Sequence, residues 1–123
     1  MSEIEYVTWE EVQRFVEKLS QELQGADISG VYGLPRGGLV FAVMLSHALD
    51  VPLLAAPHPN CVIVDDICDS GESLIHYVRN TSGEGISGMY FIATMYYKEG
   101  AAVTPDYFYK LKHDAWIQFP WEI

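Results

Sequence analysis

CVIVDDICDSGES, residues 61–73, joins an apolar run, a pair of acids and a polar turn in one short stretch. Its first residues predict a buried β-strand, because a continuous apolar run is typical of strands that are covered on both faces. Asp65 and Asp66 end that run, and Gly71 lies in a polar turn where a helix is expected to begin. A strand that leads through a turn into a helix is the repeating unit of α/β proteins with a parallel sheet.

The same alternation of strand and helix extends along the rest of the chain. Thr8 and Glu11 form a capping box, and apolar residues recur at helical spacing from there to Gly25. The other expected elements, in chain order, are a strand within 28–34, a buried helix after Gly38, a very short strand within 52–60, the strand from 61, a helix over 72–80, a loop over 81–85, a strand within 88–97, and short strands at 107–111 and 115–119. We therefore expect one α/β domain, residues 1–123, with a mainly parallel twisted sheet flanked by helices.

The composition restricts the class of partner. The 123 residues carry a formal net charge of -10, which would repel a nucleic-acid backbone or an anionic membrane surface. The sequence has no apolar window of about 18 residues, and its acidic amino terminus lacks the basic start of a signal peptide, so we expect a cytoplasmic protein. Cys61 and Cys68 are too few for a disulfide framework, and four scattered histidines predict no zinc site.

Three loops are expected to meet at one edge of the sheet. Ligands of such sheets bind beyond the carboxyl ends of the strands, where loops 34–38, 65–73 and 95–100 would lie. In the central loop, successive backbone N–H groups can form a concave nest at a helix start, and serine hydroxyls add further donors. The sequence therefore predicts a phosphate cup made of Asp69, Ser70, Gly71, Glu72 and Ser73.

The paired acids lie a few residues before this cup. Asp65 and Asp66 can accept hydrogen bonds from vicinal hydroxyls or hold magnesium through water. Acids and cup together describe a site for a ribose 5-phosphate. Taken singly, each feature also has a plainer explanation, since two acids can merely solvate a strand end and Ser70 with Gly71 can form an ordinary turn and cap.

Residues 62–73, VIVDDICDSGES, resemble the phosphoribosyl pyrophosphate signature of the type I phosphoribosyltransferases. That pattern is an apolar run, two acids, two variable residues, Asp, Thr or Ser, Gly, any residue, and Thr or Ser. Three further stretches resemble the xanthine-guanine branch of the family, namely VTWEEVQRFVEKLS at 7–20, GLPRGGLVFAVMLSHAL at 33–49 and DAWIQFPWE at 114–122. The resemblance implies the single-domain type I phosphoribosyltransferase fold.

For the phosphoribosyl half of the site, the resemblance implies a role for each matching residue. Asp65 and Asp66 would bind the ribose hydroxyls and magnesium, and loop 69–73 would hold the 5-phosphate. Arg36 with Gly37 would face pyrophosphate, often through a strained peptide bond. The implied ligands are phosphoribosyl pyrophosphate, a purine base and the product nucleoside monophosphate.

For the purine, the resemblance implies that Asp69 lies beside N7 as a candidate general base. Lys98 falls where the branch presents a lysine to the purine 6-oxo group, and Trp116 with Ile117 falls where an aromatic residue stacks on the base. A charge-assisted hydrogen bond from Lys98 would favour guanine, xanthine or hypoxanthine over adenine. On the residues alone, Lys98 can equally be a solvated turn lysine, Trp116 a core residue and Arg36 a surface arginine.

The sequence departs from the family pattern in two places. Between the second helix and the signature strand, the family carries a strand, a long mobile basic loop and a further strand, whereas residues 50–60 are short and contain no lysine or arginine. The sequence also stops at FPWEI, where the branch usually continues, so we expect a reduced hood over the base. Loss of basic groups from the lid predicts weak catalysis.

Two functions follow from this pattern. The first is a minimal purine phosphoribosyltransferase that depends on magnesium, and the second is a non-catalytic module of the same fold that senses a purine nucleotide or phosphoribosyl pyrophosphate. The apolar and aromatic content leads us to expect a homodimer, and a partner chain is one source of the missing basic lid.

Overall fold

The computed structural model describes residues 3–81 and 90–123. Its elements, in chain order, are β1 (Ile4–Tyr6), α1 (Trp9–Glu22), β2 (Val31–Gly33), α2 (Leu39–Leu49), β3 (Val62–Cys68), α3 (Glu72–Thr81), β4 (Phe91–Tyr97), β5 (Tyr107–Leu111) and β6 (Trp116–Gln118). The predicted alternation is confirmed except at two places: residues 52–60 form only an isolated bridge at Leu53 in place of the expected short strand, and the sequence did not predict β1. The loop predicted over 81–85 falls outside the described residues after Thr81, which ends α3.

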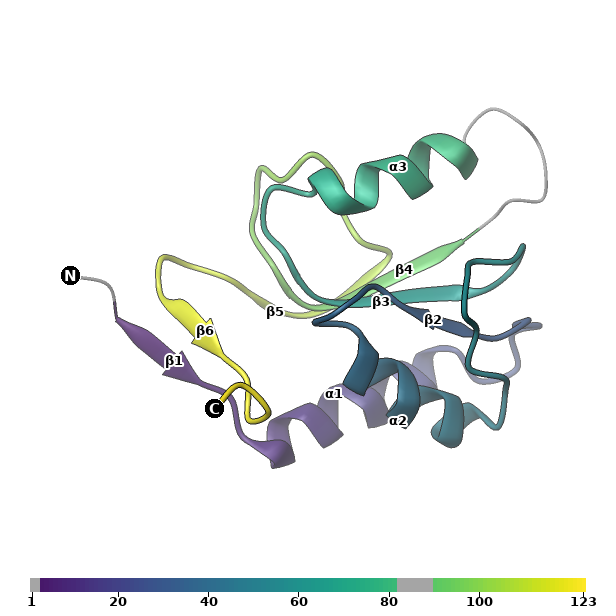
Figure 1. Ribbon diagram of the computed structural model, residues 1–123, viewed down its shortest axis with the longest axis horizontal. Helices are drawn as coiled ribbons and strands as arrows, with labels where there is room; N and C mark the ends of the chain where they lie inside the picture. Colours follow the sequence, from purple (N-terminus) through teal and green to yellow (C-terminus); the bar gives the residue numbers. More distant parts are fainter. Residues whose placement is uncertain (1–2, 82–89) are drawn as a thin grey trace.

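The strands form two parallel sheets. The larger sheet has the order β2-β3-β4-β5, and its register pairs Val31 with Val62 and Ile63 with Ile92. Strands β1 and β6 form a separate two-stranded sheet beside it, which we call the hood (Figure 1). The α/β class with parallel strands is therefore confirmed.

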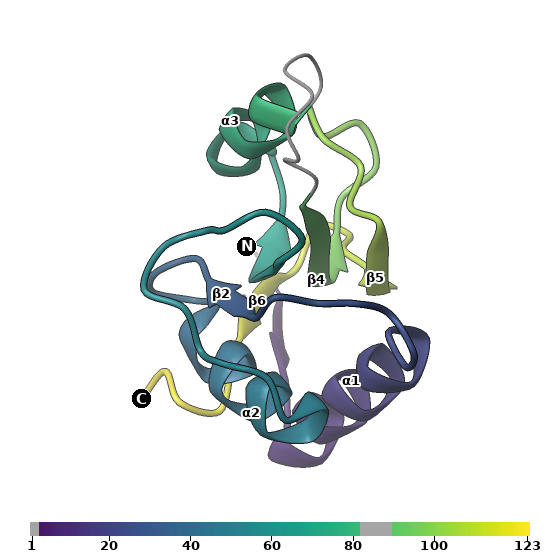
Figure 2. The same cartoon turned by 90° about the vertical axis from the view of Figure 1, so that its right-hand side faces the viewer.

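Helices cover both faces of the larger sheet. Helices α1 and α2 lie on one face and α3 lies on the other (Figures 1 and 2). The larger core cluster includes Phe15 of α1, Phe41 of α2 and Ile117 of the hood, while a second cluster joins Leu74 of α3 to Ile63 of β3. The hood thus shares its core with the α1 and α2 side of the sheet.

A capping box begins α1, and the burial of α2 is one-sided. The Thr8 hydroxyl accepts a hydrogen bond from Glu11 N (3.1 Å), and the Glu11 carboxylate accepts one from Thr8 N (3.3 Å). Such a cap contributes about 1 kcal/mol to stability. Helix α2 is apolar nearly all round, yet Leu39 and Val43 are 45 % and 43 % exposed, so only one of its faces is buried against α1 and the sheet.

Strand β3 extends further than the apolar run predicts. It continues through the acids to Cys68, because Asp65 still pairs with Thr94 and Cys68 with Tyr97 of β4. Strand β2 ends earlier, at Gly33 opposite Val64. The acids therefore lie within a strand that has lost its neighbour on one side, and this free edge faces the loop after β2.

Residues 50–60 remain at the amino end of the sheet. Leu53 forms an isolated parallel bridge with Val31, the first residue of β2, and Asn60 O accepts a hydrogen bond from Ser29 N (3.1 Å). The segment thus returns to β3 without approaching the carboxyl ends of the strands. Within the described residues, no helix has the length and apolar character needed to cross a membrane.

Candidate active site

The carboxyl ends of β2 and β3 enclose a cavity of about 320 Å³. It is lined by Leu34, Pro35, Gly37 and the continuous run 65–74. Two of the three loops predicted to meet do so in this cavity. The third loop joins them through its backbone, because Lys98 N donates to Cys68 O (2.9 Å) and Ala102 N donates to Ser70 O (2.8 Å).

The predicted cup depends on the backbone at Gly71. Gly71 has φ +82°, and a Cβ there would lie 2.8 Å from Val103 N and 3.0 Å from Ala102 N. Only glycine fits a left-handed turn pressed so closely against another backbone. Glu72 N donates to Ser70 Oγ (3.2 Å), which caps the first turn of α3 and leaves the Ser70 hydroxyl proton to donate elsewhere. The cup therefore lies at the positive end of a helix.

Cys68 is the last residue of β3 and lies beside this cup. Its thiol is buried and donates to Val103 O (3.3 Å). Burial, together with the negative charges of Asp65 and Asp69, raises the pKa of Cys68 to about 11. The thiol therefore stays protonated at neutral pH and contributes to packing, not to nucleophilic chemistry.

The paired acids differ in their surroundings. The Asp65 carboxylate accepts a hydrogen bond from Asp66 N (2.8 Å), and the Asp66 carboxylate accepts one from Ile67 N (2.7 Å). Burial, together with the negative charge of Asp66, raises the pKa of Asp65 to about 8. Asp66 points its carboxylate toward Gly37, where an added Cβ would collide with it.

A second cavity, of about 750 Å³, lies beside Gly37 and Asp66. These two residues line both cavities. The remaining lining residues are Arg36, Trp116, Gln118, Trp121, Glu122 and Ile123. The Pro35–Arg36 peptide bond, where the resemblance implies strain, is cis.

Strand β6 places its two predicted purine residues on opposite faces. Trp116 is 65 % exposed and lines the larger cavity, so it is not a core residue. Ile117 is 4 % exposed and packs in the core, so its side chain is not among those lining the cavity. This difference follows from the alternation of side chains along a strand.

Two lysines follow neighbouring strand ends, and sequence reasoning identified only one of them. Lys98 is half-buried after β4, lines neither cavity, and has no hydrogen bond or ion pair from its ammonium to residues 3–81 and 90–123. Lys112 follows β5, and its Nζ lies 3.6 Å from Asp69 Oδ2. The signal that could have identified Lys112 is its position directly after a predicted strand, the same position that identified Lys98.

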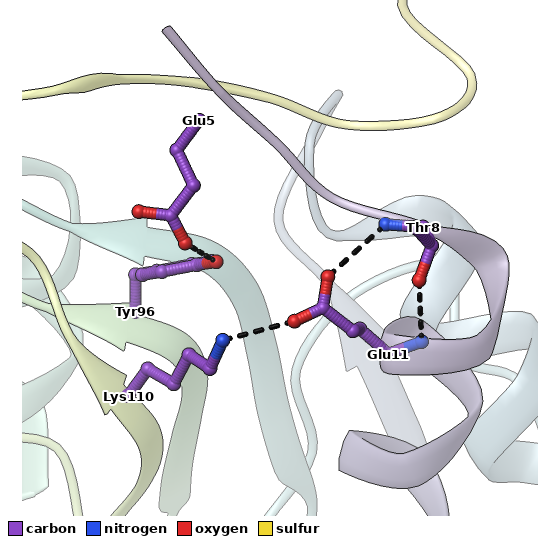
Figure 3. A network of polar contacts seen from close by, with 5 residues as sticks. All are labelled: Glu5, Thr8, Glu11, Tyr96 and Lys110. Carbon is purple, nitrogen blue, oxygen red and sulfur yellow. Dashed lines mark hydrogen bonds and ion pairs between the residues drawn. The ribbon is translucent and has the colours of Figure 1, made fainter. Parts of the chain in front are cut away.

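Polar contacts connect the hood to the larger sheet (Figure 3). Tyr96 of β4 donates from its hydroxyl to Glu5 of β1 (2.7 Å), and burial with this hydrogen bond raises the pKa of Tyr96. Lys110 of β5 donates to Glu11 of α1 (2.9 Å), and Glu11 also completes the cap at Thr8. These contacts hold the strand that pairs with Trp116 and Ile117 against the core.

A solved purine phosphoribosyltransferase from Pyrococcus horikoshii matches 98 % of this chain and 95 % of its own, at 31 % identity and a TM-score of 0.82. The chain belongs to the purine phosphoribosyltransferases. Little of either chain falls outside the match, and the predicted type I fold is confirmed. This phosphoribosyltransferase is therefore an enzyme of the pentosyltransferase class.

Other proteins similar to this phosphoribosyltransferase are also purine phosphoribosyltransferases. The xanthine-guanine phosphoribosyltransferase of Chromohalobacter salexigens is 26 % identical, over 95 % of this chain and 83 % of the relative, and that of Cereibacter sphaeroides is 29 % identical, over 96 % and 86 %. The Helicobacter pylori xanthine-guanine-hypoxanthine phosphoribosyltransferase shares the fold, with a TM-score of 0.77 at 20 % identity. No family model matches the chain.

The family implies a magnesium ion, and the carboxylates of β3 are the groups that could bind it. Within residues 3–81 and 90–123, no group of three or more His, Cys, Asp or Glu side chains could hold a metal ion by itself. Asp65 and Asp66 offer neighbouring carboxylates beside the cavities. Magnesium commonly takes one or two carboxylates and completes its shell with water and substrate phosphates, so these residues fit an ion shared with the substrate.

Proposed function

We propose that this enzyme transfers the 5-phosphoribosyl group from phosphoribosyl pyrophosphate to a 6-oxopurine, namely guanine, xanthine or hypoxanthine, and releases pyrophosphate. The observation that carries the proposal is the sharing of Gly37 and Asp66 by the two cavities. A ribose at these residues would place its 5-phosphate in the smaller cavity and its C1 side in the larger one. Such a transfer belongs to purine salvage.

The cup would bind the 5-phosphate. Backbone N–H groups of the loop over 69–73 and the hydroxyls of Ser70 and Ser73 would donate to its oxygens, with the α3 dipole behind them. Glu72 is exposed in the first turn of α3, where its carboxylate can turn to solvent and favour the helix dipole. A net acidic protein can therefore hold an anion through local donors.

The two acids, Asp65 and Asp66, would bind the ribose and not the 5-phosphate. Asp65 and Asp66 would accept hydrogen bonds from the ribose hydroxyls and would hold magnesium. When bound there, magnesium neutralises charge on the pyrophosphate. Arg36 and the Gly37 backbone would face pyrophosphate from the other side of the larger cavity.

The base would enter the larger cavity from the hood. Trp116 presents an exposed ring for stacking, while Ile117, whose side chain is in the core, would act through its main chain. The Lys98 ammonium, which has no hydrogen bond or ion pair within the described residues, would donate to the 6-oxo group. Asp69 would accept the proton that leaves N7 while N9 forms its bond to C1 and the bond from C1 to pyrophosphate breaks.

The position of residues 50–60 predicts a slow reaction. Positive charge builds on the ribose and negative charge on pyrophosphate in the transition state, and a basic lid normally stabilises that charge. Here the segment stays at the opposite end of the sheet. A loss of a few kcal/mol, or about two to three powers of ten in rate, is the expected consequence.

Assembly and location form the last part of the proposal. We propose a homodimer, because Leu39, Val43 and Trp116 leave apolar surface exposed near the site. Sedimentation at two protein concentrations tests this, and a monomer at micromolar concentration with full activity would contradict it. The cytoplasmic location stays a prediction from the sequence.

A turnover assay beside calorimetry tests the function. We expect each 6-oxopurine to yield its nucleoside monophosphate with one pyrophosphate released, and adenine to yield none. Tight binding of a purine nucleotide without any turnover would instead identify the non-catalytic module. Absence of both binding and turnover would exclude both functions.

A further inference from the structure

Lys112 is a nearly buried cation beside the site. Its side chain is only 12 % exposed, whereas that of its ion-pair partner Asp69 is 53 % exposed. Its backbone is fixed as well, because Lys112 N donates to Tyr97 O (2.8 Å) and so continues the β4–β5 ladder. The ammonium therefore reaches Asp69 from a rigid strand end.

The surroundings of the Lys112 ammonium are sparse. Within residues 3–81 and 90–123, its Nζ has two polar contacts, Asp69 Oδ2 at 3.6 Å and His113 O at 3.3 Å. Removing an ammonium from water is unfavourable unless charge or hydrogen bonds compensate it. Its other contact is a neutral carbonyl, so within the described residues the Asp69 carboxylate is the one charged group that the Lys112 ammonium contacts.

The other three lysines provide a contrast. Lys18 is exposed on α1, Lys110 pairs with Glu11, and the Lys98 ammonium has no partner within the described residues. Among the ion pairs of residues 3–81 and 90–123, the one at Lys112 alone joins the signature loop to another strand end. Asp69 makes no other ion pair in this part of the chain, so its half-exposed side chain is restrained by Lys112.

We propose that Lys112 is a positioning residue that acts through Asp69. It holds the Asp69 carboxylate in one direction at the rim of the cup, so that the carboxylate meets the purine edge without first losing rotamer freedom. The inference rests on the proposed function, in which Asp69 accepts the proton from N7. Correct placement of a reacting group can change a rate by powers of ten, and the loss of one such restraint is expected to lower kcat about tenfold.

The test compares wild type with Lys112→Met, which keeps the apolar stem and removes the charge. We expect kcat to fall about tenfold, with the KM for phosphoribosyl pyrophosphate nearly unchanged, because the cup itself is intact. Lys112→Arg, which keeps the charge, should recover most of the rate. Lys18→Met is the matched control on the exposed face of α1, and its kcat should equal that of wild type.

A double-mutant cycle identifies the route of the effect. If Lys112 acts through Asp69, Lys112→Met should have little further effect on the residual rate of Asp69→Asn. Additive losses would contradict the inference, and so would a kcat of Lys112→Met that is unchanged or raised. If Lys112→Met does not fold, Lys112→Gln, which can still donate to His113 O, replaces it in the same cycle.

The outcomes separate this inference from the proposed function. No turnover by wild type would defeat the proposed function, and the positioning role would fall with it. Turnover by wild type with an unaffected Lys112→Met enzyme would defeat the positioning role alone. A lower melting temperature with unchanged kcat would show that Lys112 is merely structural.

Discussion

The cup and the hood cavity are built in opposite ways. The cup, residues 69–73, lies in one continuous run of the smaller cavity's lining, residues 65–74, and a backbone-to-hydroxyl hydrogen bond and a left-handed glycine set its shape. The hood cavity, which is the larger cavity, is lined by three separate parts of the chain, namely residues 36–37, Asp66 and the carboxyl-terminal residues Trp116, Gln118, Trp121, Glu122 and Ile123. We therefore expect the cup to keep its shape when the hood cavity is altered, so that substitutions in the hood cavity change base binding without disturbing phosphate binding.

The largest effect should come from Asp69, which belongs to the cup and lines the smaller cavity. Asp69→Asn removes the proton acceptor but keeps the size of the side chain, so kcat should fall by about two to four powers of ten. Calorimetry should still detect binding of phosphoribosyl pyrophosphate to the Asp69→Asn variant, because the cup backbone is unchanged. Asp114→Asn, an exposed acid near the hood, is the control, and an Asp69→Asn enzyme as fast as this control would refute the role.

A substitution within the cup should damage phosphate binding next most strongly. In Gly71→Ala the new methyl group would press on Val103 N and Ala102 N, in addition to the strain of φ +82°. Gly25 has φ +83° with nothing within 4 Å, so Gly25→Ala reports the strain alone, about 1 kcal/mol. We expect Gly71→Ala to lose more stability than Gly25→Ala and to lower the affinity for phosphoribosyl pyrophosphate at least tenfold. Equal melting temperatures and equal affinities for the two variants would argue against the close approach.

A substitution in the hood should weaken binding of the purine base and leave binding of phosphoribosyl pyrophosphate unchanged. Trp116→Ala removes the exposed ring in the larger cavity, and loss of one base–aromatic stack costs about 1–3 kcal/mol. The purine KM should rise about tenfold or more, with the affinity for phosphoribosyl pyrophosphate retained. Tyr6→Ala removes a similarly exposed ring from the neighbouring hood strand and should leave both constants unchanged. A parallel loss of both affinities in Trp116→Ala would mean that the two regions are not independent.

The smallest effect concerns the ion pair between Glu11 of α1 and Lys110 of β5. The hydrogen bond from Lys110, opposed in part by burial, lowers the pKa of Glu11 below its ordinary value of 4.5. Because the folded state then binds fewer protons, the contribution to stability is present above that value and is lost as pH falls through the lower, folded value. Glu11→Gln keeps the cap geometry, so it should cost about 0.5 kcal/mol at pH 7, and this cost should shrink as the pH falls below the ordinary value. A difference in melting temperature that grows at low pH would contradict the assignment.

The same contrast explains what the sequence could predict. Asp65, Asp66 and the cup follow from neighbours in the chain, since an apolar run, an acid pair and a glycine turn specify their own geometry. The continuation of β3 to Cys68 and the burial of Ile117 depend on pairing with β4 and β1, which local pattern does not encode. The Lys112 contact joins residues 69 and 112, so it arises only when the strand ends meet.

The central claim is that a chain without a basic lid at the carboxyl ends of its described strands still transfers a phosphoribosyl group to a 6-oxopurine. The most direct test incubates the purified protein at high concentration with phosphoribosyl pyrophosphate, magnesium and guanine, xanthine or hypoxanthine in turn. Formation of the nucleoside monophosphate with an equal amount of pyrophosphate is the predicted result, at a rate that Asp69→Asn lowers by about two to four powers of ten. Absence of nucleotide from all three bases would contradict the claim.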